Sequence, residues 1–229
     1  MATSGTATFN MDFTEIAEEA WERAGREMRS GYDLRTARRS MNLLTIEWVN
    51  RGVNLWTIEE GSVSLTESTS QYTLEADTID LLEHVIRTNA GNTSTQSDLT
   101  INRIGVGDYA SIPNKLTEGR PIQMWIDRQR AAPVLNLWPV PDKSDTYVLR
   151  YWRIRRIQDA GAGVETADMN YRFLPCLVAG LAYNIALKVP ELVQRIPMLK
   201  EVYEEAFALA AAEDREKTSE YYRPRIGVI

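Results

Sequence analysis

The residues that could do chemistry in this chain begin with a single histidine. His84 is the only histidine among 229 residues, and it lies in the run LLEHVIRT, which is typical of a strand or a short helix. A Ser–His–Asp triad or a histidine-based metal site would have to use this residue, because no cysteine or second histidine lies near it. An isolated histidine is usually structural. We therefore expect no catalytic residue, no metal and no cofactor at this position.

Two further motifs have plain structural explanations. Cys176 is the only cysteine, which excludes an intrachain disulfide, and its place in an apolar helical stripe indicates a small buried residue. The segment GVGDYAS, Gly105 to Ser111, lacks the third glycine of a dinucleotide fingerprint and the Gly-Lys-Ser ending of a phosphate-binding loop. We interpret this segment as a turn.

Acidic residues leave one enzymatic alternative open. Carboxylates are abundant between residues 59 and 83, and they include Glu59, Glu60, Glu75, Asp77, Asp80 and Glu83. A glycoside hydrolase needs two such groups at a fixed separation across a cleft. Nothing in the spacing shows that any two of them converge. A glycan hydrolase that uses Glu59 or Asp80 is therefore kept as the alternative function.

The segment RYWRIRR interleaves arginines with aromatic and aliphatic residues. On a strand, Arg150 and Arg156 fall on one face, while Arg153 and Arg155 fall on or near the other. This pattern suits contact with nucleic acid or an acidic protein surface, and it also suits an exposed strand whose charges prevent edge pairing. Because the net charge of the chain is −6, we favour either an exposed strand whose arginines prevent edge pairing or contact with a protein partner. A DNA-binding module is the less favoured alternative.

The C-terminal residues 220–229, EYYRPRIGVI, have no helical or strand period, and Pro224 prevents a helix there. Aromatic and β-branched residues are rare in disordered tails but common here. The residue types that anchor interfaces are Tyr221, Tyr222, Arg223, Arg225 and Ile226. We predict a segment that orders on a partner protein and can add a strand to it.

The composition predicts a soluble globular protein. The hydrophobic fraction of 44% is enough for a buried core, and charged residues make up 25%. No apolar run approaches the ~20 residues of a membrane span. The N-terminal sequence MATSGTATFNMDF has neither the basic nor the apolar region of a signal peptide. We expect no membrane association, and the negative net charge argues against broad wrapping of nucleic acid.

Helical patterns occupy both ends of the chain. After a flexible lead-in of residues 1–10, Asp12 and Glu15 predict a capping box for a helix that runs to about Met28 and closes at Gly31.

A second helix is expected from Asp33, its N-cap, to Gly52. Towards the other end, Asp168 or Asn170 is expected to cap a helix that Pro190 stops. Pro197 is expected to open the last helix.

Strands are expected between these ends, in short runs rich in Thr, Val, Ile, Tyr and Trp. The clearest strand extends from Thr146 to Ile157, and VPDKSDT before it predicts a hairpin with VLNLWPV. One short helical or irregular piece is expected between Gly107 and Asn114. Alternation of strands and helices is absent, which argues against a doubly wound sheet.

The predicted fold class is α+β, with a discontinuous α-helical bundle, an inserted antiparallel β-rich domain and an extended C-terminal tail. We assign residues 11–56 and 167–219 to the helical domain, 57–166 to the β-rich domain and 220–229 to the tail.

Several segments, taken in order, resemble one protein family. They are ARRSMNLLTIEWVNRGVNLWTIE, YTLEADTIDLLEHVIRT, RPIQMWIDRQRAAPVLNLWPVPD and YVLRYWRIRRIQD. Together they look like the head-to-tail connector adaptors of short-tailed bacteriophages, over most of the chain from about Ala37 to Pro190. That family joins the portal ring at one capsid vertex to the tail nozzle.

The resemblance implies a structural virion protein without enzymatic activity. Its copies would form a homo-oligomeric ring, commonly a dodecamer, around the channel through which genomic DNA passes during ejection. The DNA would not be bound in a sequence-specific way. Such a protein lies in the connector region of the virion and is assembled in the host cytoplasm.

The resemblance also implies contacts for the segments singled out above. The tail, Tyr221 to Ile229, would bind the portal protein. Trp48 and Trp56 would fix the helical domain against the β-rich domain. Neighbouring subunits or the nozzle would be contacted by Arg150, Arg153, Arg155 and Arg156.

Overall fold

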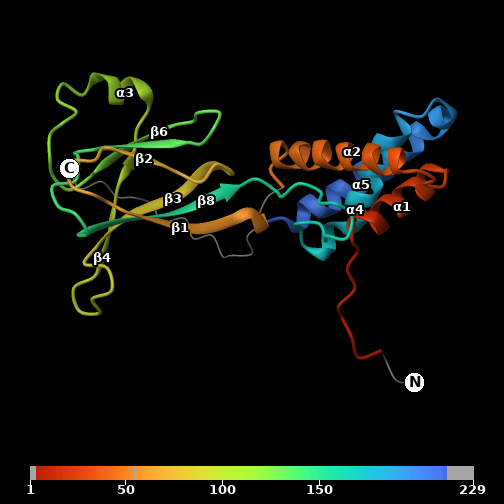
Figure 1. Cartoon of the computed structure of the whole chain (residues 1–229), viewed down its shortest axis with the longest axis horizontal. Coiled ribbons are helices and arrows are strands. Elements are labelled where there is room, and N and C mark those ends of the chain that lie inside the picture. Colours follow the sequence, from red (N-terminus) through yellow and green to blue (C-terminus); the bar gives the residue numbers. More distant parts are fainter. Residues whose placement is uncertain (1–3, 54, 216–229) are drawn as a thin grey trace, which may run out of the picture. The chain divides into compact units, whose positions relative to one another are not determined.

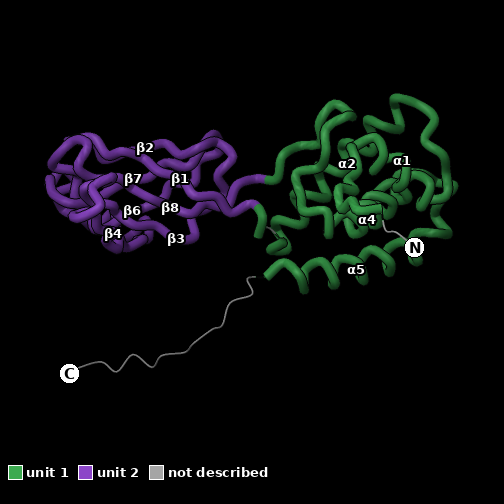
Figure 2. Tube along the Cα trace, turned by 90° about the horizontal axis from the view of Figure 1, so that it is seen from below, with its two compact units in different colours: residues 1–56, 157–229 green, residues 57–156 purple. Residues whose placement is uncertain are grey.

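Helices lie towards both ends of the chain and strands lie between them (Figure 1), which gives the predicted α+β fold with mainly antiparallel sheets. This computed structural model describes residues 4–53 and 55–215. The chain divides into two compact units (Figure 2). A helical unit combines the residues up to Trp56 with those from Ile157 onward, and a β unit spans Thr57–Arg156. Residues 157–166, expected in the β-rich domain, therefore group with the helices.

The described part of the helical unit has α1 (Phe13–Ala24), α2 (Gly31–Asn50), α4 (Leu174–Ala186) and α5 (Ile196–Glu213). Short 3₁₀ helices cover Tyr171–Phe173 and Pro190–Arg195, and another, Leu55–Thr57, lies where the two units join. Helix α4 ends before Pro190, which begins a 3₁₀ turn instead of stopping the α-helix directly.

The start of α1 follows the sequence prediction and its end does not. The Asp12 carboxylate accepts a hydrogen bond from the Glu15 backbone N–H at 2.9 Å, and the Glu15 carboxylate accepts one from the Asp12 N–H at 2.9 Å. The helix ends at Gly25, which has a left-handed φ of 102°, so the predicted end at Gly31 is wrong. Gly31 is instead the first residue of α2, because Ser30 caps that helix by accepting a hydrogen bond from the Asp33 N–H.

The core of the helical unit is built around α4, which packs against α1, α2 and α5. Trp48 on α2 is fully buried, and its indole N–H donates to the Tyr203 hydroxyl at 3.1 Å. Trp56 packs against Phe173 with a ring-centroid separation of 4.7 Å. The indole N–H of Trp56 donates to the Asp168 carbonyl at 2.9 Å. Both tryptophans thus make contacts inside the helical unit.

The β unit contains two four-stranded sheets. The first has the order β1-β8-β3-β4, and the second has the order β2-β7-β6-β5. Their bounds are β1 (Ile58–Ser64), β2 (Gln71–Thr73), β3 (Thr78–Thr88), β4 (Ser97–Thr100), β5 (Asn102–Arg103), β6 (Gln123–Asp127), β7 (Val134–Trp138) and β8 (Tyr147–Arg155). All described pairs are antiparallel except β5 with β6. The segment GVGDYAS includes a short helix, α3 (Val106–Ser111), which agrees with the short helical piece expected from about Gly107 and differs from the turn expected for the motif itself.

The two sheets share one hydrophobic core. Leu149 and Tyr151 from β8 lie in the same buried cluster as Met124 from β6 and Leu137 from β7. Along β8 buried and partly exposed residues alternate, as the period of a strand requires. Strand β8 is an inner strand, and its buried face includes Arg153.

The predicted hairpin between VLNLWPV and the following strand is wrong. Strand β7 pairs with β2 and β6, whereas β8 pairs with β1 and β3 in the other sheet. The connection between Trp138 and Tyr147 is longer than the two to five residues typical of hairpin loops. It crosses from one sheet to the other, which lets both strands bury side chains in the shared core.

We predict that Gly180→Ala destabilises the helical unit. Gly180 lies within α4, where an added Cβ would be 2.7 Å from Cε2 of Tyr203 and 2.9 Å from Cδ2 of Leu44. Overpacking of this kind costs ~1–3 kcal/mol. That cost outweighs the gain of up to ~1 kcal/mol that alanine brings to an open helical position. Urea unfolding followed by circular dichroism should show the lower free energy of unfolding.

The matched control is Gly31→Ala, since an added Cβ at this helical glycine meets nothing within 4 Å. This variant should be as stable as the wild type or more so. A Gly180→Ala protein that is no less stable than the wild type would contradict the described packing of α4.

Candidate functional site

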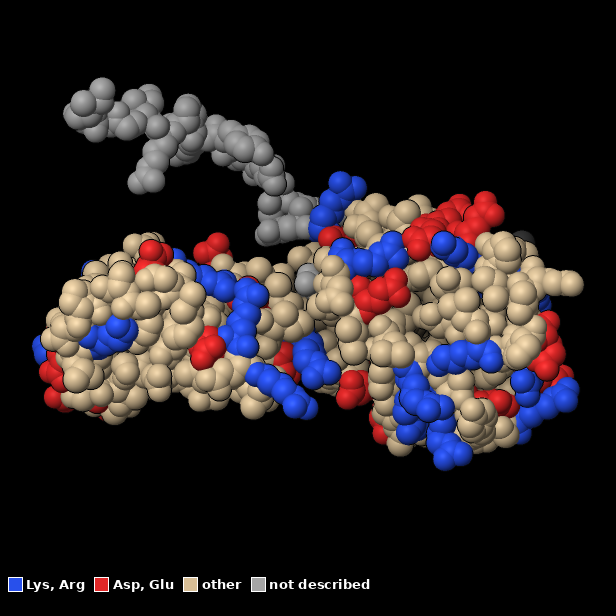
Figure 3. Space-filling view, turned by 90° about the horizontal axis from the view of Figure 1, so that it is seen from above, with Lys and Arg blue, Asp and Glu red and all other residues tan. Residues whose placement is uncertain are grey.

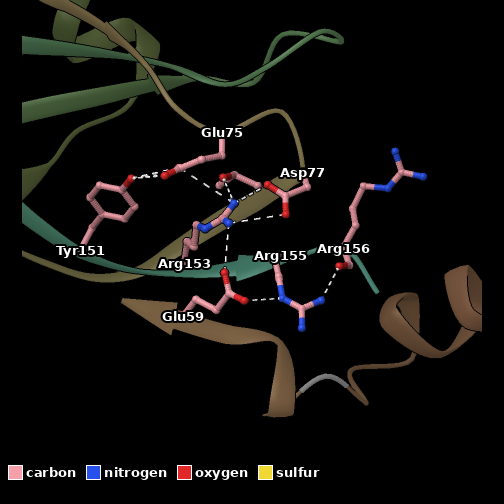
Figure 4. A network of polar contacts seen from close by, with 8 residues as sticks. Glu59, Glu75, Asp77, Tyr151, Arg153, Arg155 and Arg156 are labelled. Carbon is pink, nitrogen blue, oxygen red and sulfur yellow. Dashed lines mark hydrogen bonds and ion pairs between the residues drawn. The ribbon is translucent and has the colours of Figure 1, made fainter. Parts of the chain in front are cut away.

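Arg153 lies at the centre of a polar network in the β unit (Figure 4) and is only 8% exposed. Its Nη1 donates to Asp77 Oδ1 at 2.5 Å and to Thr78 Oγ1 at 2.8 Å. Its Nη2 donates to Glu59 Oε2 at 3.0 Å. These partners come from β1, from the segment before β3 and from β3 itself. Arg153 therefore joins three segments of the β unit by charge-assisted hydrogen bonds.

The other arginines of β8 and its end have different environments. Nε of Arg155 donates to Glu59 Oε1 at 2.6 Å, and Nε of Arg150 donates to Glu60 Oε1 at 2.9 Å. Arg156 is exposed, and Figure 4 shows its side chain pointing away from the network. Of the four candidate contact arginines, three are in ion pairs within the unit and Arg156 extends into solvent.

The pKa values of Asp77 and Tyr151 in this network differ from their usual values. The hydrogen bond from Arg153 lowers the pKa of Asp77 below its usual value. Burial raises the pKa of Tyr151 to about 12, and its hydroxyl donates to Glu75 Oε2 at 3.0 Å. A general acid or base works best with a pKa near the operating pH. Both shifts move the group away from neutrality, which is typical of a structural network.

The two carboxylates named for a glycan hydrolase are each held by two arginines. Glu59 accepts hydrogen bonds from Arg153 and Arg155. Asp80 accepts one from Arg103 at 2.9 Å and another from Arg128. A glycosidase needs two carboxyl groups that are free to act on a substrate across a cleft, whereas these two are engaged by guanidinium groups of the same unit. These contacts favour structural roles for Glu59 and Asp80.

The remaining chemical candidates are partly or fully buried. His84 lies on β3, and burial lowers its pKa. Cys176 lies in the core of the helical unit, where burial raises the pKa of its thiol to about 12. Within residues 4–53 and 55–215, no three His, Cys, Asp or Glu side chains are grouped so that they could hold a metal ion. None of the described helices is long and apolar enough to cross a bilayer.

The helical unit offers a different kind of site on the outer side of α2. Tyr32, Leu43 and Ile46 are 63%, 65% and 48% exposed, which is high for large apolar side chains. Arg35 and Arg39 lie between Tyr32 and Leu43 along the helix and are also exposed. Figure 3 shows Lys and Arg side chains interspersed with uncharged side chains and with Asp and Glu on the face of the molecule that it views. An exposed apolar surface with charges at its border is typical of a protein interaction site.

A groove of about 500 Å³ runs beside this surface. Its walls include Tyr32, Arg39 and Leu43 from α2, Trp21 from α1, and Lys188 after α4. Exposed side chains of α2 thus form one wall of a concave surface, which gives a partner both a ridge and a hollow to contact.

The outer side of α5 is a second surface of this type, with the opposite charge. Met198, Val202 and Leu209 are 49%, 45% and 67% exposed. Glu201 and Glu205 are exposed on the same helix. The buried side of this helix consists of Leu199, Tyr203 and Phe207. The signal that could have revealed both surfaces is the repeat of large apolar residues outside the buried stripe.

The residues predicted to bind the portal, Tyr221, Tyr222, Arg223, Arg225 and Ile226, lie outside the described residues. Their assignment stays a prediction.

Comparison with known families identifies the class of protein that this fold and these surfaces belong to. The model of the SU10 adaptor protein family matches residues 11–227. The chain therefore belongs to the SU10 adaptor protein family and is a phage structural adaptor, in agreement with the predicted head-to-tail adaptor. Comparison with curated proteins finds no significant match.

We predict that Arg153→Met destabilises the β unit by about 1–3 kcal/mol at neutral pH, because Asp77 and Glu59 lose their charged donor. The folded-state pKa of Asp77 is lowered, so the stability that it contributes is present above its unfolded pKa. That stability is lost as the pH falls through the folded value. The difference between variant and wild type should therefore shrink below about pH 4. Urea unfolding at several pH values measures it.

The matched control is Arg156→Met, which removes an exposed guanidinium three residues along the same segment. It should change the free energy of unfolding little at any pH. Equal effects of the two substitutions would show that the contacts of Arg153 do not stabilise the β unit.

Proposed function

We propose that this protein forms the adaptor ring that joins the portal to the tail nozzle of a phage and lines the DNA channel. The observation that carries the proposal is the family match, which extends from residue 11 to residue 227. A match of this extent includes both units and the C-terminal residues that we assign to the portal.

In this proposal the C-terminal tail is the portal-binding element. Tyr221 and Tyr222 would supply rigid aromatic anchors, and Arg223 and Arg225 would pair with acidic groups of the portal. The family match continues through Ile226, which supports a function of this segment that the family shares. An extended segment of this kind gains affinity by adding main-chain hydrogen bonds to the edge of a sheet.

The charge of the chain suits a channel wall. A net charge of −6 repels the phosphate backbone, so DNA can pass without being held. The arginines of β8 would otherwise attract DNA, but Arg150, Arg153 and Arg155 are paired with carboxylates of the same unit. These pairs support a stiff structural unit over the DNA-binding alternative.

The proposed partners are other copies of the chain in a ring, which we expect to be a dodecamer, together with the portal and the nozzle. Arg156 is the arginine of the original set that is most available to a neighbouring subunit or to the nozzle, because its side chain is exposed. The ring would be assembled in the host cytoplasm and would stay in the connector region of the virion. No catalytic step is part of this role.

We predict that the protein and the portal from the same genome form one closed complex, and that deletion of residues 220–229 abolishes it. The deletion removes the aromatic and arginine anchors of the proposed contact. Native mass spectrometry of the mixture, with and without the deletion, gives the number of adaptor copies per portal.

The control is deletion of residues 1–10, a segment of equal length that lies outside the family match. It should leave the complex intact. If the full chain fails to bind the portal, the proposed function is wrong. If the shortened chain lacking 220–229 still binds, the portal contact lies elsewhere on the protein.

A further inference from the structure

The outer faces of α2 and α5 carry residues at matching intervals. On α2 the exposed positions opposite its buried side include Tyr32, Arg35, Arg39, Leu43 and Ile46. On α5 the corresponding positions are Met198, Glu201, Glu205, Leu209 and Ala212, and Val202, Glu204 and Ala208 at the edges of this face are exposed as well. The steps along both helices are three, four, four and three residues, so every α2 position corresponds to the α5 position 166 residues later. Both series span 15 residues, or about 21 Å of helix from the first residue to the last.

The two series are complementary in charge and alike in apolar character. Aligned in parallel, Arg35 meets Glu201 and Arg39 meets Glu205. The same alignment places Leu43 against Leu209. Within the described residues, none of these four charged side chains makes an ion pair, so their charges are available to a partner.

Contact between the two faces would also be energetically favourable for each of them. Like charges at positions i and i+4 repel one another on an isolated helix, and this applies to Arg35 with Arg39 and to Glu201 with Glu205. Opposite charges from a second helix would relieve both repulsions. The apolar residues beside them are exposed to water in the single chain, and contact would bury them.

The two faces cannot satisfy each other within one chain. Both helices direct their buried side at α4, and the exposed positions lie on the opposite side of each helix. In Figure 2, α4 lies between α2 and α5, so the outer faces point away from one another. A contact between such faces must therefore join two chains.

We propose that the outer face of α2 in one subunit docks in parallel on the outer face of α5 in the next copy of this chain. Spacings of three and four residues are those at which two helices pack along a seam. A contact between two different surfaces is head-to-tail, and such contacts generate a ring when the rotation closes. The inference rests on the proposed adaptor function and assigns the subunit contact to particular residues.

Charge reversal tests the contact in the full-length chain, alone and mixed with the portal from the same genome. One variant carries Arg35→Glu and Arg39→Glu, and a second carries Glu201→Arg and Glu205→Arg. Each should lose the assembled species in native mass spectrometry, because like charges then face one another. A third variant with all four substitutions should regain assembly, because the charges are again complementary in reversed order.

The matched control carries Glu18→Arg and Glu22→Arg, an exposed pair on α1 with the same spacing as Glu201 and Glu205 and the same change in charge as the second variant. It should assemble as the wild type does. Circular dichroism confirms that each variant is folded, and recovery in the fourfold variant excludes unfolding as the cause of the loss.

The outcomes separate this inference from the proposed function. If the wild type assembles on the portal and both charge reversals do so equally well, the α2–α5 contact is wrong and the adaptor function stands. If the fourfold variant fails to recover, the pairing of these two faces is also wrong. If the wild type stays monomeric both alone and with the portal, the proposed function and the contact fail together.

Discussion

The helical unit depends on the burial of α4, a helix without a charged residue. Ten of its 13 residues are buried, so it is covered on nearly every side and has no face suited to water. Its cover comes from α1 and α2, which precede the β unit in sequence, and from α5, which follows it. The β unit must therefore be an insertion that leaves the helical unit and returns to it. Covering α4 also uses the inner faces of α2 and α5, and this leaves their outer faces exposed in the single chain.

The β unit is held together by charge as well as by its apolar core. Arg153 is almost buried and bridges carboxylates on two segments that are distant in sequence. A guanidinium in such a place is tolerated only with good partners, and removing it would leave the carboxylates facing one another. The same arrangement pairs Glu59 with Arg155, which favours structural roles for both residues. In the proposed function, an adaptor between portal and tail would benefit from units that are stiff in this way.

Local signals in the sequence were sufficient to predict most helices and strands. They were insufficient to predict which strands pair with one another. The capping box at Asp12 and Glu15 and the alternation along β8 are local, so they could be predicted. The predicted end of α1 was Gly31, because the apolar pattern continues to Met28. The helix instead ends at Gly25, because this glycine readily adopts the left-handed conformation that terminates a helix.

Pairing between distant strands could not be predicted in the same way. The order of the sheets places β8 between β1 and β3, and nothing near β8 in sequence indicates this. The internal role of Arg153 follows from that register, since Glu59 is its directly paired residue on β1. The helical period alone places the residues of each exposed face of α2 and α5 on one side of the helix. Which side is exposed became clear only once the buried sides were known.

The most direct test of the central claim is cross-linking between subunits on the portal. A chain with Leu43→Cys and Leu209→Cys places one thiol on each outer face, and the native Cys176 is buried in the core. With a short bifunctional thiol reagent, the account predicts a ladder of covalent multimers in the portal complex, while either cysteine alone gives no ladder. An assembled complex in which the double variant stays uncross-linked would contradict it.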